Sequence, residues 1–291
     1  MDYHLAIGDR SYSSWSLRGW LLFDHPAIPV KTHLARLYAP DFAQVLADFA
    51  PARLVPALRL PSGRVVGETL AIAETLAERH PEAGLWPQDP EARAQARYMV
   101  SEMHAGFSAL RSHCAMNLKL SYADCAPTEA VLADVARIDQ IWQAARAEFG
   151  TAGPWLFGDW TIADAFFAPV AARIAGHALA VSAVSEAYVA TTLADPSFRR
   201  WRAMGWAEHV DQVNYARPWP QRPWPGPAPI PARVSAGPSV NAFCPYSGKP
   251  VTDFLEMQGR VWGFCNPFCR DKTMADPEVW PAFMAMVAEK A

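Results

Sequence analysis

A proline-rich stretch constrains the fold of this chain more than any other feature. Residues 217–240, RPWPQRPWPGPAPIPARVSAGPSV, contain eight prolines. Proline has no amide donor and a fixed φ, so the stretch favours an extended path over a helix or an inner strand. We predict a linker or strap over residues 216–240. Its tryptophans, Trp219 and Trp224, either pack on the preceding domain, which we favour, or present a polyproline ligand to a partner.

The chain before this stretch begins with mixed helix and strand patterns. Residues 3–8 and 30–37 are predicted strands, separated by a helix over 16–25. Residues 54–80 divide into a strand, a Ser-Gly turn, a second strand and a helix. The order βαβαββα, with two parallel strands and an antiparallel hairpin, predicts a thioredoxin-like α/β domain over residues 1–82.

Helical patterns then dominate. Residues 91–113 and 129–150 are long amphipathic segments. The segment WTIADAFFAPVAARIAG has Asp164 three residues after Thr161, which predicts a capping box at the start of a buried helix. Residues 87–215 are therefore predicted to form a second, all-helical domain.

Composition excludes several classes of function. The formal net charge of −3 gives no basic field for nucleic acid or anionic lipid. We see no secretory signal and no apolar run of the ~20 residues that a membrane span needs, so we predict a cytoplasmic protein. Five cysteines, an odd and uneven set, argue against a disulfide framework. Cys114 and Cys125 lie mid-chain, whereas the other three lie near the end.

Motifs in the first two domains carry a family resemblance. SSWSLRGW (13–20), LVPAL (54–58) and GETLAIAETL (67–76), followed by TIADA (161–165), resemble the glutathione transferase family over about residues 1–215. Within the family, the chain is similar to the bacterial serine-type enzymes. The resemblance implies glutathione as co-substrate, conjugation of its thiolate to a small electrophile, and a homodimer.

The stretch SSWSLRGW places hydroxyl groups at the predicted start of a helix. A helix N-terminus stabilises an anion, and hydroxyl donors there would lower the pKa of a thiol that ordinarily titrates near ~8.5. The resemblance places the activating serine here. Ser13 is our first choice and Ser14 the second; Ser11 stays eligible, and Trp15 and Arg18 are expected in the same pocket. The alternative is that these serines only cap the helix.

Two further motifs are expected to hold glutathione. The Val55–Pro56 bond is a candidate cis peptide, and the resemblance implies that its backbone pairs with the cysteinyl part of glutathione; the alternative is an ordinary strand-edge proline. Glu68 and Thr69, at another helix start, suit the γ-glutamyl ammonium and carboxylate, or simply cap that helix.

The electrophile is expected between the two domains. The resemblance places its site near the middle-helix residues Tyr98, His104, Phe107 and Arg111, although aromatic residues at this spacing are also typical of a core. The chain departs from the family pattern in having Ala50, not asparagine, before Pro51. It also has no cysteine at the first helix, which argues against thiol exchange.

Residues 241–291 form a predicted third segment. A segment of this length is too short for a stable core without a further stabilising element such as a bound metal. CPYSGKPV and GFCNPFCRDK resemble the YHS/TRASH-type metal-binding module, a small treble-clef-like fold. The resemblance implies that Cys244, Cys265 and Cys269 bind a metal such as zinc, and soft thiolates would also accept Cu(I). Ser247 stands where the knuckle would have its second cysteine, so Asp271, Asp253, a water or a group from elsewhere in the chain is a candidate fourth ligand.

Two functions follow from these patterns. The first is a glutathione transferase. The alternative is a metal-responsive or metal-binding protein that uses the transferase fold as a non-catalytic scaffold. A vestigial module, in which the three thiols pack as small apolar groups, is a further possibility for residues 241–291.

Overall fold

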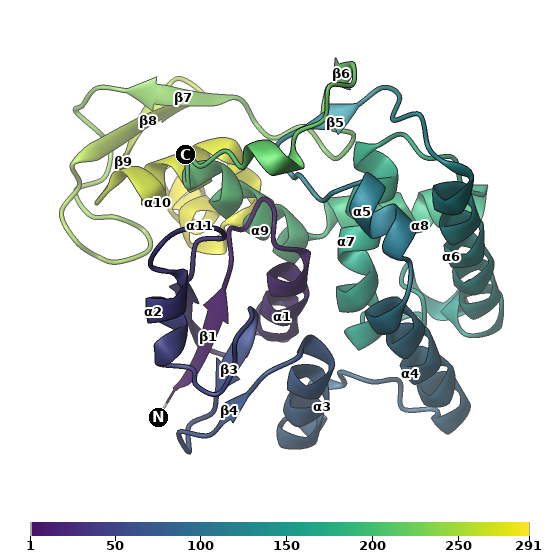
Figure 1. The fold of residues 1–291 in the computed structure, drawn as a ribbon. Coiled ribbons are helices and arrows are strands. Elements are labelled where there is room, and N and C mark those ends of the chain that lie inside the picture. The colour runs from purple at the N-terminus through teal and green to yellow at the C-terminus, as the bar shows by residue number, and fades with distance from the viewer. Residues whose placement is uncertain (1, 291) are drawn as a thin grey trace. The chain divides into compact units, whose positions relative to one another are not determined.

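The computed structural model describes residues 2–290, which form two compact units (Figure 1). Unit 1 combines the chain up to Leu193 with Gln212–Pro225. Unit 2 combines Ala194–Asp211 with the chain from Gly226 onward. The boundaries differ from the predicted segments because each unit is closed by a piece of chain that is distant in sequence.

Unit 1 opens with the thioredoxin-like domain that the strand and helix patterns predict. Its elements are β1 (Tyr3–Ile7), α1 (Ser14–Asp24), β2 (Val30–Leu34), α2 (Phe42–Ala47), β3 (Ala57–Arg59), β4 (Val65–Val66) and α3 (Thr69–Arg79). The sheet order is β2-β1-β3-β4. β1 pairs in parallel with β2 and antiparallel with β3, and Leu5 lies opposite both Thr32 and Leu58. The predicted domain type is confirmed.

α1 packs closely on the loop that precedes β3. Its residues Leu17, Leu21 and Leu22 are buried, which explains why this short sequence folds as a helix against the sheet. A Cβ at Gly19 would lie 2.9 Å from Cγ of Pro56. Glycine at this position therefore lets the middle of α1 and the proline loop approach each other.

Helices make up most of the rest of unit 1. They are α4 (Pro90–Ala105), α5 (Ser108–His113), α6 (Glu129–Glu148), α7 (Ile162–Gly176) and α8 (Ala183–Ala194), with short 3-10 turns η1 (Pro81–Ala83), η2 (Gly150–Ala152) and η3 (Val213–Tyr215). The predicted capping box is present at the start of α7, where Asp164 accepts from the Thr161 amide at 2.8 Å. No helix within residues 2–290 is both long and apolar enough to cross a membrane.

The first part of the proline-rich segment packs on unit 1. β6 (Gln221–Arg222) pairs with β5 (Ser121–Tyr122), a two-stranded sheet that the sequence did not predict. The Trp219 ring lies 5.4 Å from the ring of Tyr122 and 5.8 Å from that of His177. Trp219 therefore packs on its own unit, as the favoured interpretation expected.

Unit 2 is a small α/β body. Its elements are α9 (Pro196–Ala207), β7 (Ala232–Ser235), β8 (Asp253–Met257), β9 (Arg260–Phe264), α10 (Pro267–Ala275), η4 (Pro277–Val279) and α11 (Pro281–Glu289). The sheet order is β7-β8-β9, and both pairings are antiparallel. Leu255, Trp262, Phe264 and Phe283 are buried in its core, together with Ala203 of α9.

Two segments of unit 2 lie outside the predicted terminal module. The sequence pattern assigned α9 to the helical domain and β7 to the linker. Instead, Arg199 of α9 donates two hydrogen bonds of 2.8 Å to the Asp276 carboxylate, and β7 forms an edge of the three-stranded sheet. A hairpin and two short helices bury too little apolar surface alone, so α9 and β7 complete the core.

Candidate functional site

A buried carboxylate organises the loop between β1 and α1. Asp9 is fully buried and accepts from the Leu37 amide at 2.7 Å and from Arg36 at 3.1 Å. The Gly8 amide donates to the Ser16 hydroxyl at 2.8 Å. These contacts fix the direction in which the first turn of α1 presents its amides.

Ser13 and Ser14 occupy the start of α1 in different ways. Ser13 is the N-cap: its Oγ accepts from the Ser16 amide at 3.4 Å, and its hydroxyl donates to Ser16 Oγ at 2.8 Å. Ser14 Oγ accepts from Nη2 of Arg173 at 3.5 Å. Ser13 therefore does cap the helix, as the alternative interpretation expected, and Ser14 is linked to a buried cation.

Both serines line a cavity of about 460 Å³ in unit 1. It brings together Ser13, Ser14, Trp15 and Val55 among the predicted site residues, and Arg111 of α5. Its other lining residues are Tyr12, Leu37, Phe42, Leu54, Ser108, Ser112, Ala115, Arg173 and Tyr215. The lining formed by the described residues contains arginines and no carboxylate. Sequence reasoning assigned no role to Arg173 or Tyr215, which lack a local motif.

Two guanidinium groups flank the ring of Trp15, which lines this cavity. Arg18 lies 4.3 Å above the ring centroid and Arg111 5.0 Å from it. Burial, reinforced by the charge of Arg111, lowers the pKa of Arg173 to about 10. Arg18 is fully buried, and its Nη1 and Nη2 atoms have no hydrogen-bond partner among the described residues. Arg18 and Arg173 are buried cations with no carboxylate partner among the described residues, which makes this region suited to an anion.

The two predicted glutathione-holding motifs lie beside this region. The Val55–Pro56 peptide bond is cis, as anticipated. Thr69 is buried and is the first residue of α3, whereas Glu68 precedes it with φ of 60° and makes no side-chain cap bond. The Glu68 carboxylate is largely exposed and lies 3.7 Å from Nε2 of His104, whose ring lies 5.1 Å from that of Trp15.

Several predicted residues lie outside the cavity lining that the described residues form. Ser11 is buried with an unpartnered hydroxyl, and Tyr98 is half exposed and accepts from Arg137 at 2.6 Å. Phe107 is buried with φ of 56°, and it separates α4 from α5. Arg18, Pro56, Glu68, Thr69 and His104 are also outside. For the predicted residues of the middle helix, the helix break at Gly106 and Phe107 accounts for the difference, because the short helix α5, and not the end of α4, lines the cavity.

The three terminal cysteines converge in unit 2. The sulfur atoms of Cys244, Cys265 and Cys269 lie within 4.8 Å of one another. Burial opposes ionisation of Cys244, but backbone amides, chiefly those of Tyr246 and Cys265, outweigh it and lower its pKa. Burial and the nearby Cys244 charge raise the pKa of Cys269 to about 12. Three thiolates this close need a cation to ionise together.

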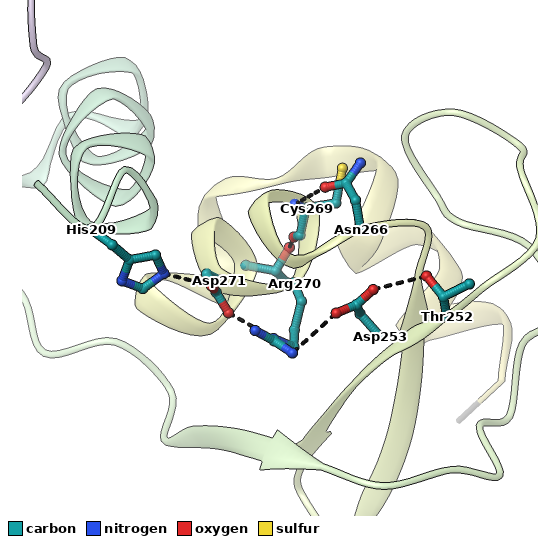
Figure 2. Close-up of polar contacts among 8 residues, drawn as sticks. His209, Thr252, Asp253, Asn266, Cys269, Arg270 and Asp271 are labelled. Carbon is teal, nitrogen blue, oxygen red and sulfur yellow. Dashed lines mark hydrogen bonds and ion pairs between the residues drawn. The ribbon is translucent and has the colours of Figure 1, made fainter. Parts of the chain in front are cut away.

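The carboxylates predicted as a fourth ligand point elsewhere. Figure 2 shows Arg270 between them, with its Nε 2.7 Å from Asp271 and its Nη1 3.2 Å from Asp253. Asp271 also bonds His209 at 2.7 Å. The prediction that Asp271 or Asp253 completes the cluster is therefore wrong, because both are held in ion pairs. The hydroxyl of Ser247 instead donates to the Cys265 sulfur at 3.2 Å.

Asn241 braces the turn that carries Cys244. Its Nδ2 donates to the carbonyls of Phe243 and Gly263 at 2.9 Å, and its Oδ1 accepts from the Gly263 amide at 2.8 Å. This buried side chain joins the cysteine turn to β9. The sequence offered no signal for it beyond an isolated asparagine before the first cysteine.

The thioredoxin-like domain of unit 1 matches a known family model. The family model "Glutathione S-transferase, N-terminal domain" matches residues 12–79. The fold agrees over a longer stretch: a glutathione transferase homologue from Burkholderia, solved with bound glutathione, is 22% identical with a TM-score of 0.54, covering 70% of this chain and 98% of that one. The chain thus carries a glutathione transferase fold, with a thioredoxin-like domain followed by a helical domain.

The curated relatives that match part of this chain carry the name of an isomerase. Maleylacetoacetate isomerase from Rattus norvegicus is 35% identical over 33% of this chain and 44% of its own length; the probable enzyme from Caenorhabditis elegans is 34% identical over 35% and 47%. The chain thus spans about half the length of these relatives. A maleylacetoacetate isomerase from Anaeromyxobacter dehalogenans, with dicarboxyethyl glutathione and citrate in its active site, is 25% identical with a TM-score of 0.50, covering 69% of this chain and 94% of that one.

Proposed function

We propose that this protein is a glutathione-dependent transferase that joins the glutathione thiolate to a small electrophile. The observation that carries the proposal is the cavity at the start of α1, which is lined by Ser13 and Ser14, the buried guanidinium of Arg173 and Val55. Glutathione binding by solved relatives of the same fold supports it.

In this proposal the thiolate lies at the N-cap of α1. The dipole and free amides of the helix favour the anion. Ser13 donates to the sulfur, and the bond between Ser13 and Ser16 reverses so that Ser16 becomes its donor; hydroxyl hydrogens rotate freely enough for this exchange. Arg173 acts through its charge and through Ser14.

The remaining parts of glutathione follow the two other motifs. The backbone of Val55 pairs with the cysteinyl unit, while Thr69 and the start of α3 hold the γ-glutamyl carboxylate. Glu68 binds the ammonium group, and the exposed position of its carboxylate leaves it accessible for this contact. Assembly as a homodimer, which the family resemblance implies, belongs to the same proposal.

The cationic wall favours an electrophile that carries a carboxylate. Arg111 and Arg173 line the cavity without an acid in its described lining, so an anionic substrate would offset the burial of Arg173. The isomerase names of the relatives fit the same first step, because thiolate addition precedes both conjugation and double-bond isomerisation. Formation of a stable conjugate distinguishes transfer from isomerisation.

The test is calorimetric titration of glutathione into the protein, with the ultraviolet absorbance of the thiolate followed against pH. We expect binding and a thiol pKa well below the free value. Product analysis by mass spectrometry then separates a conjugate from an isomerised substrate. Absence of binding would leave the serines as helix caps and remove the basis for the proposal.

A second candidate function is metal binding by the cysteine cluster of unit 2. The observation that favours it is the convergence of three sulfur atoms on a turn, a strand end and a helix start. The donor set fits a soft ion held by three thiolates, such as Cu(I), or zinc with an exchangeable fourth ligand. A four-cysteine structural zinc site does not fit, because Ser247 stands at the fourth position.

Metal analysis of protein purified without chelator tests this candidate. We expect about one equivalent of metal in the wild type and a large loss in Cys265→Ser. Cys125→Ala is the matched control, because it removes a cysteine that lies in unit 1 and outside the cluster. Equal metal content in both variants would contradict the assignment.

A further inference from the structure

Two buried cysteines of unit 1 lie outside the proposed chemistry of the cavity. Cys114 follows the last residue of α5 and is fully buried, whereas Cys125 follows β5 and is 1% exposed. Both are free thiols, and their side chains form a hydrogen bond with each other. The fold therefore brings into contact two sulfur atoms that the sequence identified only as mid-chain cysteines.

Side chains hold the backbone at both cysteines. Nε of Arg173 donates to the Cys114 carbonyl at 2.9 Å. Nε2 of His113 lies 3.1 Å from the Cys125 carbonyl oxygen and donates to it. Because each backbone is held from a different side, the two thiols stay opposite each other, which is the arrangement that a disulfide needs.

The loop between the two cysteines supports the cavity at the start of α1. Ala115 lines the cavity directly. The Leu118 amide donates to the Ser11 carbonyl at 3.0 Å, and the Ala123 amide donates to the Pro220 carbonyl at 2.8 Å. A covalent bond between the ends of this loop would therefore act on a wall of the cavity.

Cys125 is the cysteine that local opening reaches first. It is buried, whereas the residues on either side of it, Asp124 and Ala126, are exposed. A segment with so few buried neighbours opens at a small free-energy cost. Burial raises the pKa of Cys114 to about 12 and also raises the pKa of Cys125, so both thiols are protonated and unreactive while the segment is closed.

We propose that Cys114 and Cys125 are a disulfide-forming pair that glutathione disulfide oxidises. The Cys125 thiolate attacks one sulfur of glutathione disulfide, one glutathione leaves as its thiolate, and a mixed disulfide remains on Cys125. Cys114 then loses its proton to water and attacks the Cys125 sulfur, which releases the second glutathione. The two cysteines lose two electrons and two protons, and glutathione disulfide takes both electrons. The inference goes beyond the proposed transferase function and does not depend on it, because glutathione disulfide oxidises thiols without a binding site.

The experiment incubates the folded, reduced protein with glutathione disulfide in excess over glutathione, quenches with acid and alkylates the remaining thiols. Trypsin cuts after Arg111, Lys119 and Arg137, so the two cysteines fall in separate peptides. Mass spectrometry should find peptides 112–119 and 120–137 joined, and dithiothreitol should separate them. The urea midpoint of the oxidised protein should rise by about 1 M, because the bond constrains the unfolded chain.

Two variants test the order of attack. Cys114→Ala removes the second thiol, so a glutathione adduct should accumulate on Cys125. Cys125→Ala should leave Cys114 unmodified. Cys265→Ser is the control, because it removes a thiol of the cluster in unit 2. It should join peptides 112–119 and 120–137 to the same extent as the wild type.

Three results would overturn the inference. If both cysteines of the wild type stay reduced, the two thiols are apolar packing groups. If the link forms only in urea, the pair meets through nearness in sequence and not in the fold. If either cysteine links to a thiol of unit 2 instead, the contact seen in unit 1 does not direct the oxidation. A protein that fails to bind glutathione can still form this disulfide, so the two proposals fail separately.

Discussion

Replacing Ser13 by alanine is expected to raise the pKa of bound glutathione. The substitution removes the hydroxyl at the N-cap of α1 and leaves the helix amides and Arg173 in place. A hydrogen bond to a charged group contributes ~1.5–3 kcal/mol, which corresponds to about one to two pKa units. The helix dipole contributes ~0.3–1 kcal/mol and does not replace it.

The assay is the ultraviolet thiolate absorbance of the complex, measured against pH in wild type and variant. Ser13→Ala also loses a cap worth ~1 kcal/mol of stability, so a second cap variant is needed. Thr128→Ala serves, since Thr128 caps α6 by accepting from the Val131 amide at 3.3 Å. We expect it to match the stability loss without any change in thiol pKa.

The result that would refute this reasoning is a thiol pKa in Ser13→Ala equal to that of the wild type, with stability reduced as in Thr128→Ala. Ser13 would then be a cap alone. The same titration on Ser14→Ala identifies the donor, because a rise confined to that variant transfers the role to Ser14 and its contact with Arg173.

Three further predictions concern stability and the cysteine cluster. Burial lowers the pKa of His177 to about 4, whereas an unfolded histidine titrates near ~6.5. The free energy of unfolding should therefore be unaffected by this group above pH ~6.5 and should fall by about 3 kcal/mol between pH ~6.5 and pH ~4. His177→Phe should flatten this part of the pH profile of denaturation. Arg199→Met leaves the buried Asp276 carboxylate without its bidentate partner. Chemical denaturation should show a loss of ~3–5 kcal/mol at neutral pH that shrinks in acid, and a loss independent of pH would count against the ion pair. Asn241→Ala should weaken metal binding, because it removes the hydrogen bonds that join the Cys244 turn to β9. Competition with a chromogenic chelator measures the affinity. An unchanged affinity would show that the turn keeps its conformation without Asn241.

Local patterns predicted the thioredoxin-like domain well. The short apolar run of β1 and the apolar spacing of Leu17 and Leu21 decide between strand and helix within a few residues. The capping box of Thr161 and Asp164 is equally local, since both partners lie within one turn. Such features need no knowledge of the rest of the chain, so the sequence suffices to predict them.

Features that depend on distant partners were missed or misplaced. The apolar face of α9 shows that the helix packs on something, but not that it packs in the unit of the cysteine cluster. Asp253 and Asp271 were plausible metal ligands until Arg270 was seen between them. A carboxylate has the same ligand chemistry in either setting, so only its neighbours determine which role it takes.

The sequence by itself determined the architecture of the first domain, the helix start with its serines, and the three cysteines as a set, because each depends on residue type and short-range spacing. Tertiary structure alone decided which groups meet. It placed Arg173 behind Ser14 and brought Tyr215 to the same cavity across about two hundred residues of chain. Such contacts arise from the packing of whole elements, and no short stretch of sequence encodes that packing.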